Sequence, residues 1–187
     1  MKVTLVDWTE NPEQKIAMCA AICYDADTSE EANDRRVKRL MNVGHLATLR
    51  FAYATFKIEG VSRTCSHQLV RHPHLSYLQR SQRYCNDSDM AFVTPEAIVD
   101  LEEYDAFMET SLKYYEKLLE SGVKKGDARF VLPQACTTDL YISGNFQAWN
   151  DFLKNRTDKA AQWEIRDVAL EIQRELRRIA PNVFGEG

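Results

Sequence analysis

The sequence lacks several features that would assign it to a familiar class. No apolar run approaches the roughly 18 residues of a membrane span, and there is no glycine-rich phosphate loop of either familiar type. The net charge of −4 argues against a dedicated nucleic-acid coat protein, which is usually basic. The five cysteines are odd in number and scattered, which favours reduced thiols over a disulfide framework. We therefore expect a cytoplasmic protein, of a bacterium or of a host cell if a phage carries the gene, with residues 1–187 forming one domain.

One segment lacks acidic residues altogether. From Gly60 to Asn86 there is no Asp or Glu, although acidic residues outnumber Lys and Arg in the whole chain. Cations and neutral hydrogen-bond donors without carboxylates are suited to binding an anion. Each charge-assisted hydrogen bond contributes about 1.5–3 kcal/mol, so a few of them hold a nucleotide monophosphate. The segment, here called the acid-free window, contains Arg63, His67, Arg71, His72, His74, Arg80 and Arg83.

Other interpretations of the window are weaker. A solvated basic loop would not be expected to exclude carboxylates over such a length. Cys65, His67, His72 and His74 match no zinc or iron spacing, and no metal is expected. Cys85 is a conceivable nucleophile, but a small buried thiol is the simpler interpretation. Binding of nucleic acid is disfavoured by the acidic total, and we expect neither a nucleic-acid nor a membrane partner.

Apolar periodicity predicts an α+β fold, with a central, mainly antiparallel sheet flanked by helices that include long amphipathic ones. Gly60 is expected to end the second strand, Ser62 to cap the next helix, and Gly44 and Pro181 to follow helix ends. We expect strands at 3–6, 51–58 and 137–143, and helices that begin at Asn11-Pro12 and at Ser29 and that cover 62–71, 101–119, 145–154 and 159–179, with shorter helical elements from Thr94 and over 126–133.

The window also carries a resemblance. Arg71-His72, then Ser76-Tyr77, then Ser81-Gln82-Arg83-Tyr84 resembles the signature of the flavin-dependent thymidylate synthases, Arg-His-Arg, a spacer and Ser-x-Arg-Tyr. Upstream, Gly44-His45 and the run from Ile58 to His72 resemble the segments that precede this signature in the family. Downstream, the segments 128–133 (ARFVLP) and 155–165 (NRTDKAAQWEI) resemble two further family elements. The match runs in order through most of the chain.

This resemblance implies an enzyme that methylates dUMP to dTMP reductively. Methylenetetrahydrofolate would supply the carbon, and NADPH the hydride through FAD. It also implies a homotetramer whose active sites are shared between subunits, and it implies no attack by an enzyme cysteine.

The same resemblance implies roles for individual residues. Ser81 and Arg83 would hold the phosphate, Arg129 would approach from another subunit, and Arg156 would act catalytically at the pyrimidine. His72 would lie against the flavin. The dUMP set is Gln68, Arg71, Gln79, Arg80, Ser81, Gln82, Arg83, Arg129 and Arg156. The FAD set is His45, Thr48, Arg71, His72, Pro73, Gln79, Asn145, Gln147 and Asp151, with Asn145 and Gln147 on a neighbouring chain.

The sequence departs from the family pattern mainly on the flavin side. Pro73 replaces the second arginine of Arg-His-Arg, Arg50-Phe51 stands where many relatives have Glu-His, and Ala160 occupies a position that is often His. Arg50 is a candidate to replace the charge absent at Pro73. Two alternatives follow: a diverged flavoenzyme acting on another pyrimidine nucleotide, and a nucleotide-binding homologue that has lost flavin chemistry.

Overall fold

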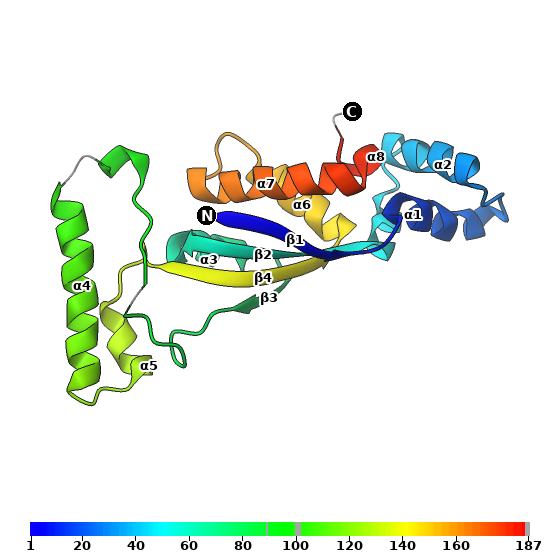
Figure 1. Ribbon diagram of the computed structural model, residues 1–187. Coiled ribbons are helices and arrows are strands. Elements are labelled where there is room, and N and C mark those ends of the chain that lie inside the picture. The colour runs from blue at the N-terminus through cyan, green and yellow to red at the C-terminus, as the bar shows by residue number, and fades with distance from the viewer. Residues whose placement is uncertain (89, 100–101, 186–187) are drawn as a thin grey trace.

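An antiparallel sheet lies at the centre of the fold (Figure 1). The computed structural model describes residues 1–88, 90–99 and 102–185. Within these ranges the sheet has four strands in the order β1-β2-β4-β3, and every neighbouring pair is antiparallel. In the central register, Phe56 lies opposite Leu5 on one side and Ile142 on the other. The strands are β1 (Lys2–Trp8), β2 (Tyr53–Ser62), β3 (Ser76–Gln79) and β4 (Thr137–Asn145). The predicted α+β class is confirmed.

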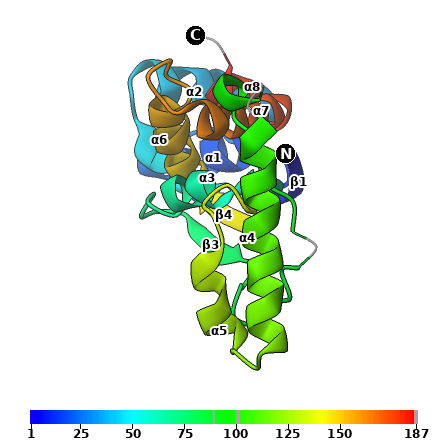
Figure 2. The same ribbon diagram turned by 90° about the vertical axis from the view of Figure 1, so that its left-hand side faces the viewer.

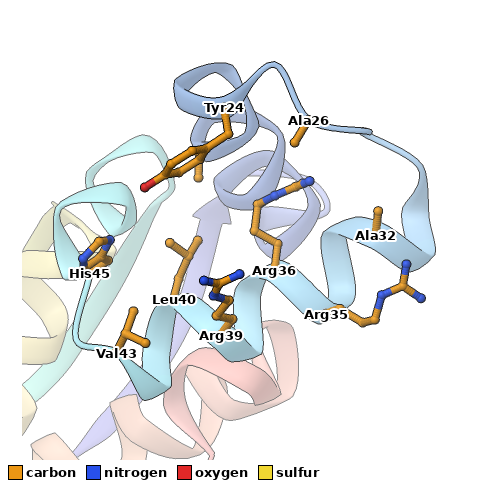
Figure 3. Close-up of a pocket in the computed structure, with 10 residues that line it drawn as sticks. Tyr24, Ala26, Ala32, Arg35, Arg36, Arg39, Leu40, Val43 and His45 are labelled. Carbon is orange, nitrogen blue, oxygen red and sulfur yellow. The ribbon is translucent and has the colours of Figure 1, made fainter.

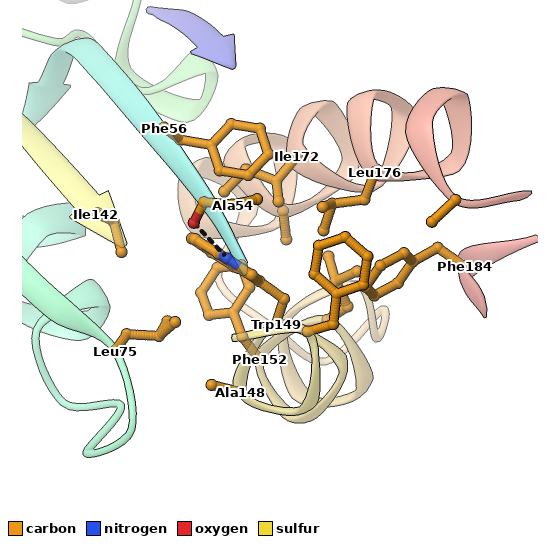
Figure 4. Packing of buried hydrophobic residues seen from close by; sticks show 14 of the residues in the cluster. Ala54, Phe56, Leu75, Ile142, Ala148, Trp149, Phe152, Ile172, Leu176 and Phe184 are labelled. Carbon is orange, nitrogen blue, oxygen red and sulfur yellow. Dashed lines mark hydrogen bonds between the residues drawn. The ribbon is translucent and has the colours of Figure 1, made fainter. Parts of the chain in front are cut away.

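Helices cover one face of the sheet, and they bury the apolar half of its alternating strands. Ala54, Phe56 and Ile58 of β2 are fully buried, whereas their sequence neighbours are not. They pack against α6 (Phe146–Arg156) and α7 (Trp163–Ile179). Figure 4 shows Trp149 at the centre of this core, where its indole N–H donates to the carbonyl of Ala54 at 3.0 Å. A period of two on the strands and of three to four on α7 builds this interface.

The remaining elements lie at the two ends of the sheet. At one end, α1 (Pro12–Ala21) and the 3-10 turn η1 (Ile22–Tyr24) pack beside α2 (Glu30–Asn42), and α8 (Pro181–Phe184) lies nearby. At the other end, α4 (Glu102–Glu120) and α5 (Lys125–Ala128) extend away from the sheet as an arm (Figures 1 and 2). Three further 3-10 turns and a short helix complete the described chain: η2 (Leu46–Phe51), η3 (Glu96–Ile98), η4 (Arg129–Val131) and α3 (Arg63–Leu69).

Gly60 does not end the second strand as predicted. Its φ of 69° lies in the left-handed region, and the register between β2 and β4 shifts between Ile58 and Val61. Its N–H donates to the carboxylate of Asp139 at 2.9 Å. Glycine at this position forms a bulge, after which the strand continues to Ser62.

Several other boundaries differ from those predicted. The strand Ser76–Gln79 was not predicted, and Phe51 belongs to η2 rather than to β2. The α3 helix ends at Leu69, before Arg71, and α7 begins at Trp163 because the Gln162 side chain caps it. The prediction that a helix begins at Leu101 falls outside the described residues. Asn11 precedes α1 as predicted, but its side chain makes no capping hydrogen bond.

All five cysteines are free thiols. Burial raises the pKa of Cys65 above its usual range and that of Cys136 to about 11. Within the described ranges, no helix has the length and apolar character needed to cross a membrane, and no group of His, Cys, Asp or Glu is arranged to hold a metal ion.

Candidate functional site

The turn after α3 meets the end of α6 at a contact between His72 and Arg156. Arg156 Nε donates to His72 Nε2 at 2.9 Å, and the imidazole packs edge-on against Phe152 with ring centroids 4.9 Å apart. Burial lowers the pKa of His72, and the charge of Arg156 lowers it further. The imidazole is therefore held neutral, as an acceptor, and the guanidinium is oriented by it.

A second set of contacts ties α3 to the start of α7. Gln68 Nε2 donates to Gln162 Oε1 at 3.5 Å, and the same Gln162 oxygen accepts from the first N–H groups of α7. Ser62, which caps α3 by accepting from the Cys65 N–H at 3.0 Å, donates both its N–H and its hydroxyl to the buried carboxylate of Glu164. These bonds fix the direction of α3, which carries Gln68 and leads into Arg71.

Gln79 lies on β3 and joins three elements. Its amide nitrogen donates to the Ser66 hydroxyl on α3 at 3.0 Å and to the Thr138 hydroxyl on β4 at 3.2 Å. Gln79 therefore already uses its amide donors inside the protein, and within the described ranges no hydrogen bond engages its side-chain oxygen.

The turn after β3 carries the predicted phosphate-binding residues. The guanidinium of Arg80 pairs with the buried carboxylate of Asp87 and with the carbonyl of Asn86. One cation of the acid-free window is thus neutralised by an acid just beyond its end. The exposed guanidinium of Arg83 lies 5.4 Å from the Tyr84 ring centroid, and within the described ranges no carboxylate pairs with it. The Ser81 oxygen accepts from the Arg83 N–H at 3.3 Å, so this turn presents a hydroxyl and a cation together.

A hollow of about 250 Å³ adjoins this turn. It is lined by Gln82 and Arg129, as the dUMP prediction requires, and also by Arg63 and His67. Burial lowers the pKa of Arg63, and the charge of Arg129 lowers it further, so two cations face one another here. Arg63 and His67 had no assigned role, although the absence of acids around them was the signal that could have identified them.

Three residues predicted for FAD meet in a second hollow, of about 350 Å³. Asn145, Gln147 and Asp151 line it together with Arg50 and His74. Gln147 Nε2 donates to Asp151 at 3.0 Å, while Gln147 Oε1 is buried without a hydrogen-bond partner among the described residues. A buried acceptor of this kind is costly unless a ligand supplies a donor.

The other predicted FAD residues lie elsewhere on the protomer. Arg71 and Pro73 are exposed on either side of His72. His45 lines a third hollow, of about 720 Å³, formed by α1, η1 and α2, and the Thr48 hydroxyl donates to the His45 carbonyl at 3.0 Å. The protomer therefore does not unite the whole FAD set in one cavity.

The hollows lined by arginine and histidine, and the turn that presents a hydroxyl beside an arginine, are suited to binding anionic ligands such as phosphates. Comparison with known proteins is more specific. The chain belongs to the family described as "Thymidylate synthase complementing protein", whose family model matches residues 4–182.

Curated relatives share this similarity over nearly the whole chain. The chain is 36% identical to a flavin-dependent thymidylate synthase of Clostridium tetani, over 98% of this chain and 85% of that protein. It is 38% identical to a protein of the same name from Pyrococcus abyssi, over 95% of this chain and 80% of that one. A third, from Thermococcus onnurineus, is 37% identical over 95% and 79%. The resemblance seen in the sequence is confirmed.

Proposed function

We propose that this protein catalyses the reductive methylation of dUMP to dTMP, with methylenetetrahydrofolate as the carbon donor and with NADPH as the hydride source through FAD. Its family membership supports this reaction. Within the structure, the observation that carries the proposal is the contact of Arg156 with neutral His72. This contact places an oriented cation next to the elements that carry the acid-free window.

The window supplies the groups for dUMP. Ser81 and Arg83 bind its phosphate, since a hydroxyl and a guanidinium fork match phosphate oxygens. Gln82 and Arg129 line the adjoining hollow. The negative charge of the dUMP phosphate would offset the repulsion between Arg129 and Arg63 there. Gln68, Arg71, Gln79 and Arg80 complete the site, Arg80 by shaping the turn through Asp87.

Arg156 acts on the pyrimidine. A fixed cation at the ring stabilises the negative charge that develops as N3 loses its proton, and this raises the nucleophilicity of C5. Arginine suits the task because it remains charged at any working pH. Its Nε is held by His72, and no other hydrogen bond of this side chain is present in the described part of the chain, so its terminal nitrogens are available to substrate.

The residues around Gln147 fit FAD. The partnerless Gln147 oxygen would accept from an N–H or hydroxyl of the cofactor, while Arg50 and His74 would face its phosphates. Bound FAD would supply the hydride that completes the methyl group. His72, Asn145 and Asp151 would position it with His45, Thr48, Arg71, Pro73 and Gln79.

We further propose that residues 1–187 act as one domain in a cytoplasmic homotetramer. The predicted FAD residues are distributed over separate hollows of one protomer, as expected if neighbouring subunits complete each site.

The test is formation of dTMP by the purified, flavin-loaded protein. We expect product from dUMP, NADPH and methylenetetrahydrofolate, and none from an Arg156→Ala protein that still binds dUMP. Arg174→Ala is the matched control, because Arg174 pairs with Glu171 on the exposed side of α7. No product from the parent protein would reject the proposal.

Two results would favour the alternatives. A colourless protein that refuses added FAD would indicate a homologue without flavin chemistry, whereas a flavin-loaded protein that alkylates another pyrimidine nucleotide would indicate a diverged enzyme. An Arg50→Ala protein that holds FAD as tightly as the parent would show that Arg50 does not replace the charge absent at Pro73.

A further inference from the structure

The proposed reaction assigns no ligand to the hollow of about 720 Å³ between α1, η1 and α2. Of the predicted site residues, it contains His45 alone. Figure 3 shows Arg36 pointing from α2 toward the side of Tyr24 and Ala26, Arg39 beside Leu40 and Val43, and Arg35 directed outward at the other end of the hollow. The hollow therefore combines three arginines with an aromatic ring.

Two of these arginines, Arg35 and Arg39, are not paired with an acidic side chain within the described ranges. The Arg36 guanidinium is occupied: it donates to the carbonyls of Ala17 and Asp27 and to the Asn33 side chain. Arg35 and Arg39, in contrast, make no hydrogen bond or ion pair within the described ranges. They lie four residues apart on one face of α2, where like charges repel. An anion between or beside them would relieve this repulsion.

The neighbouring carboxylate does not fill that role. Asp27 lies close enough for the charges of Arg36 and Arg35 to contribute to its lowered pKa. The larger causes are hydrogen bonds from Ser29, whose hydroxyl and N–H both donate to the Asp27 carboxylate, at 2.7 and 3.0 Å. Asp27 is thus directed toward Ser29, and the charge of Arg39 remains uncompensated.

The rest of the lining is better suited to an aromatic ring of a ligand than to a flexible chain of carboxylates. Ala20, Leu40 and Val43 contribute apolar side chains to the lining, here called the apolar floor. Tyr24, which lies above Leu40 and Val43 in Figure 3, has 78% of its surface exposed. An exposed aromatic ring and adjacent arginines can stack a base and bind a phosphate. A poly-carboxylate chain would gain nothing from the apolar floor.

We propose that this hollow binds the adenosine 2′-phosphate end of NADPH, with Arg39 and Arg35 on the 2′-phosphate and Tyr24 against the adenine. The inference rests on NADPH being the reductant in the proposed function. The 2′-phosphate is a monoester with close to two negative charges at neutral pH, and arginine is the usual partner that distinguishes it from a free 2′-hydroxyl. The diphosphate of FAD, also an adenosine phosphate, carries one charge per phosphorus and places a smaller demand on paired arginines.

Binding of adenosine 2′,5′-bisphosphate to the FAD-loaded protein tests the proposal, with 5′-AMP as the matched probe that lacks the 2′-phosphate. We expect the bisphosphate to bind more tightly than 5′-AMP. Arg39→Ala should raise its dissociation constant about 10- to 100-fold, as the loss of one charge-assisted hydrogen bond predicts, and should leave the dissociation constant of 5′-AMP nearly unchanged. Arg35→Ala should act in the same direction. Lys38→Ala is the control, because Lys38 is exposed on α2 but lines a different hollow.

A kinetic readout should agree with the binding data. In rapid mixing without dUMP, Arg39→Ala should raise the NADPH concentration that half-saturates flavin reduction by about the same factor as the dissociation constant, and should not change the value for NADH.

Three results would overturn the proposal: equal binding of the two probes by the parent, bisphosphate binding by Arg39→Ala that equals the parent's, or binding only when FAD is absent. The last would assign the hollow to the adenosine end of FAD. If the protein makes no dTMP but still binds the bisphosphate more tightly than 5′-AMP in an Arg39-dependent way, the proposed reaction would be rejected and the proposed binding site would be supported.

Discussion

At the scale of single residues, the contact between His72 and Arg156 shows how the fold keeps a cation available. Arg156 ends α6, and its Nε–H needs a neutral acceptor. Phe152, one turn earlier on the same helix, packs against the same imidazole. Burial then disfavours the imidazolium, so the histidine orients the arginine without competing with it for an anion.

This pairing predicts a pH dependence of stability. The pKa of His72 is lowered in the folded protein, so the unfolded chain takes up the proton first as the pH falls below about 6.5. The contribution of His72 is complete above that pH and is lost between it and the lower folded-state pKa. Urea midpoints of the parent should therefore fall more than those of His72→Gln between about pH 7.5 and 5.5. Parallel pH profiles for the two proteins would contradict this.

A second prediction concerns Arg83, whose exposed guanidinium lies beside Ser81 and Tyr84. Arg83→Ala should weaken dUMP binding about 10- to 100-fold, the worth of one charge-assisted contact with phosphate. Arg83→Lys should lose less, because it keeps the charge but not the fork. Calorimetric titration with dUMP measures both, and Arg174→Ala serves as the surface control. An unchanged affinity in Arg83→Ala would remove Arg83 from the phosphate site.

The sequence indicated candidate residues for the site, but it did not indicate how they are bonded. The window pointed to Ser81 and Arg83 because charge composition is a local property of the chain. It did not show that Arg80 is already paired. Asp87 lies just outside the window, and only the fold of the turn brings its carboxylate next to Arg80. The grouping of Arg50 and His74 with Asn145 also depends on tertiary packing that no spacing encodes.

At the scale of elements, α3 is held in place by α7. Glu164 is buried and accepts from both the N–H and the hydroxyl of Ser62, at the start of α3. This bond, with the Gln68–Gln162 contact, fixes the helix that leads to Arg71 and His72.

Glu164→Ala should therefore cost about 2–4 kcal/mol of unfolding free energy, because it leaves two buried donors without an acceptor. Glu164→Gln retains one acceptor oxygen and should cost clearly less. Guanidinium denaturation at fixed protein concentration compares the variants. If both substitutions cost the same small amount, Glu164 does not anchor α3.

The elements themselves were predicted where the pattern is local. Helices with caps or breakers, such as α6 after Asn145, and strands with clear alternation, such as β2, were found. The four-residue strand β3 was missed because its formation depends on pairing with β4, some 60 residues later in the chain. Gly60 was assigned as a breaker because sequence alone does not distinguish a bulge from an end.

At the scale of the whole molecule, the arm leaves apolar side chains uncovered. Of the described residues of α4, only Met108 and Tyr115 are buried, whereas Phe107 and Tyr114 are exposed, as is Phe130 of η4. Exposed rings on a helix that extends away from the sheet are typical of a surface that another subunit covers (Figure 2).

Phe107→Asp should therefore weaken assembly, because a buried carboxylate at a subunit contact is costly. Light scattering after size-exclusion chromatography should show a shift from the proposed tetramer to smaller species as the protein is diluted. Glu109→Ala is the control, since Glu109 is exposed on the same helix and pairs with Lys113. A tetramer that persists in Phe107→Asp at every concentration would place the interface elsewhere.

The two edge strands of the sheet limit how copies of this protein can associate. The edge strand β1 carries an irregularity between Leu5 and Asp7, and the opposite edge strand β3 has only four residues. Short or kinked edges offer few free backbone groups in register, so they are poor templates for another chain. In the proposed tetramer, the subunits are thus hindered from joining by continuing one another's sheet. Association is directed instead to side-chain surfaces, which can close into a finite assembly and do not propagate as a fibre.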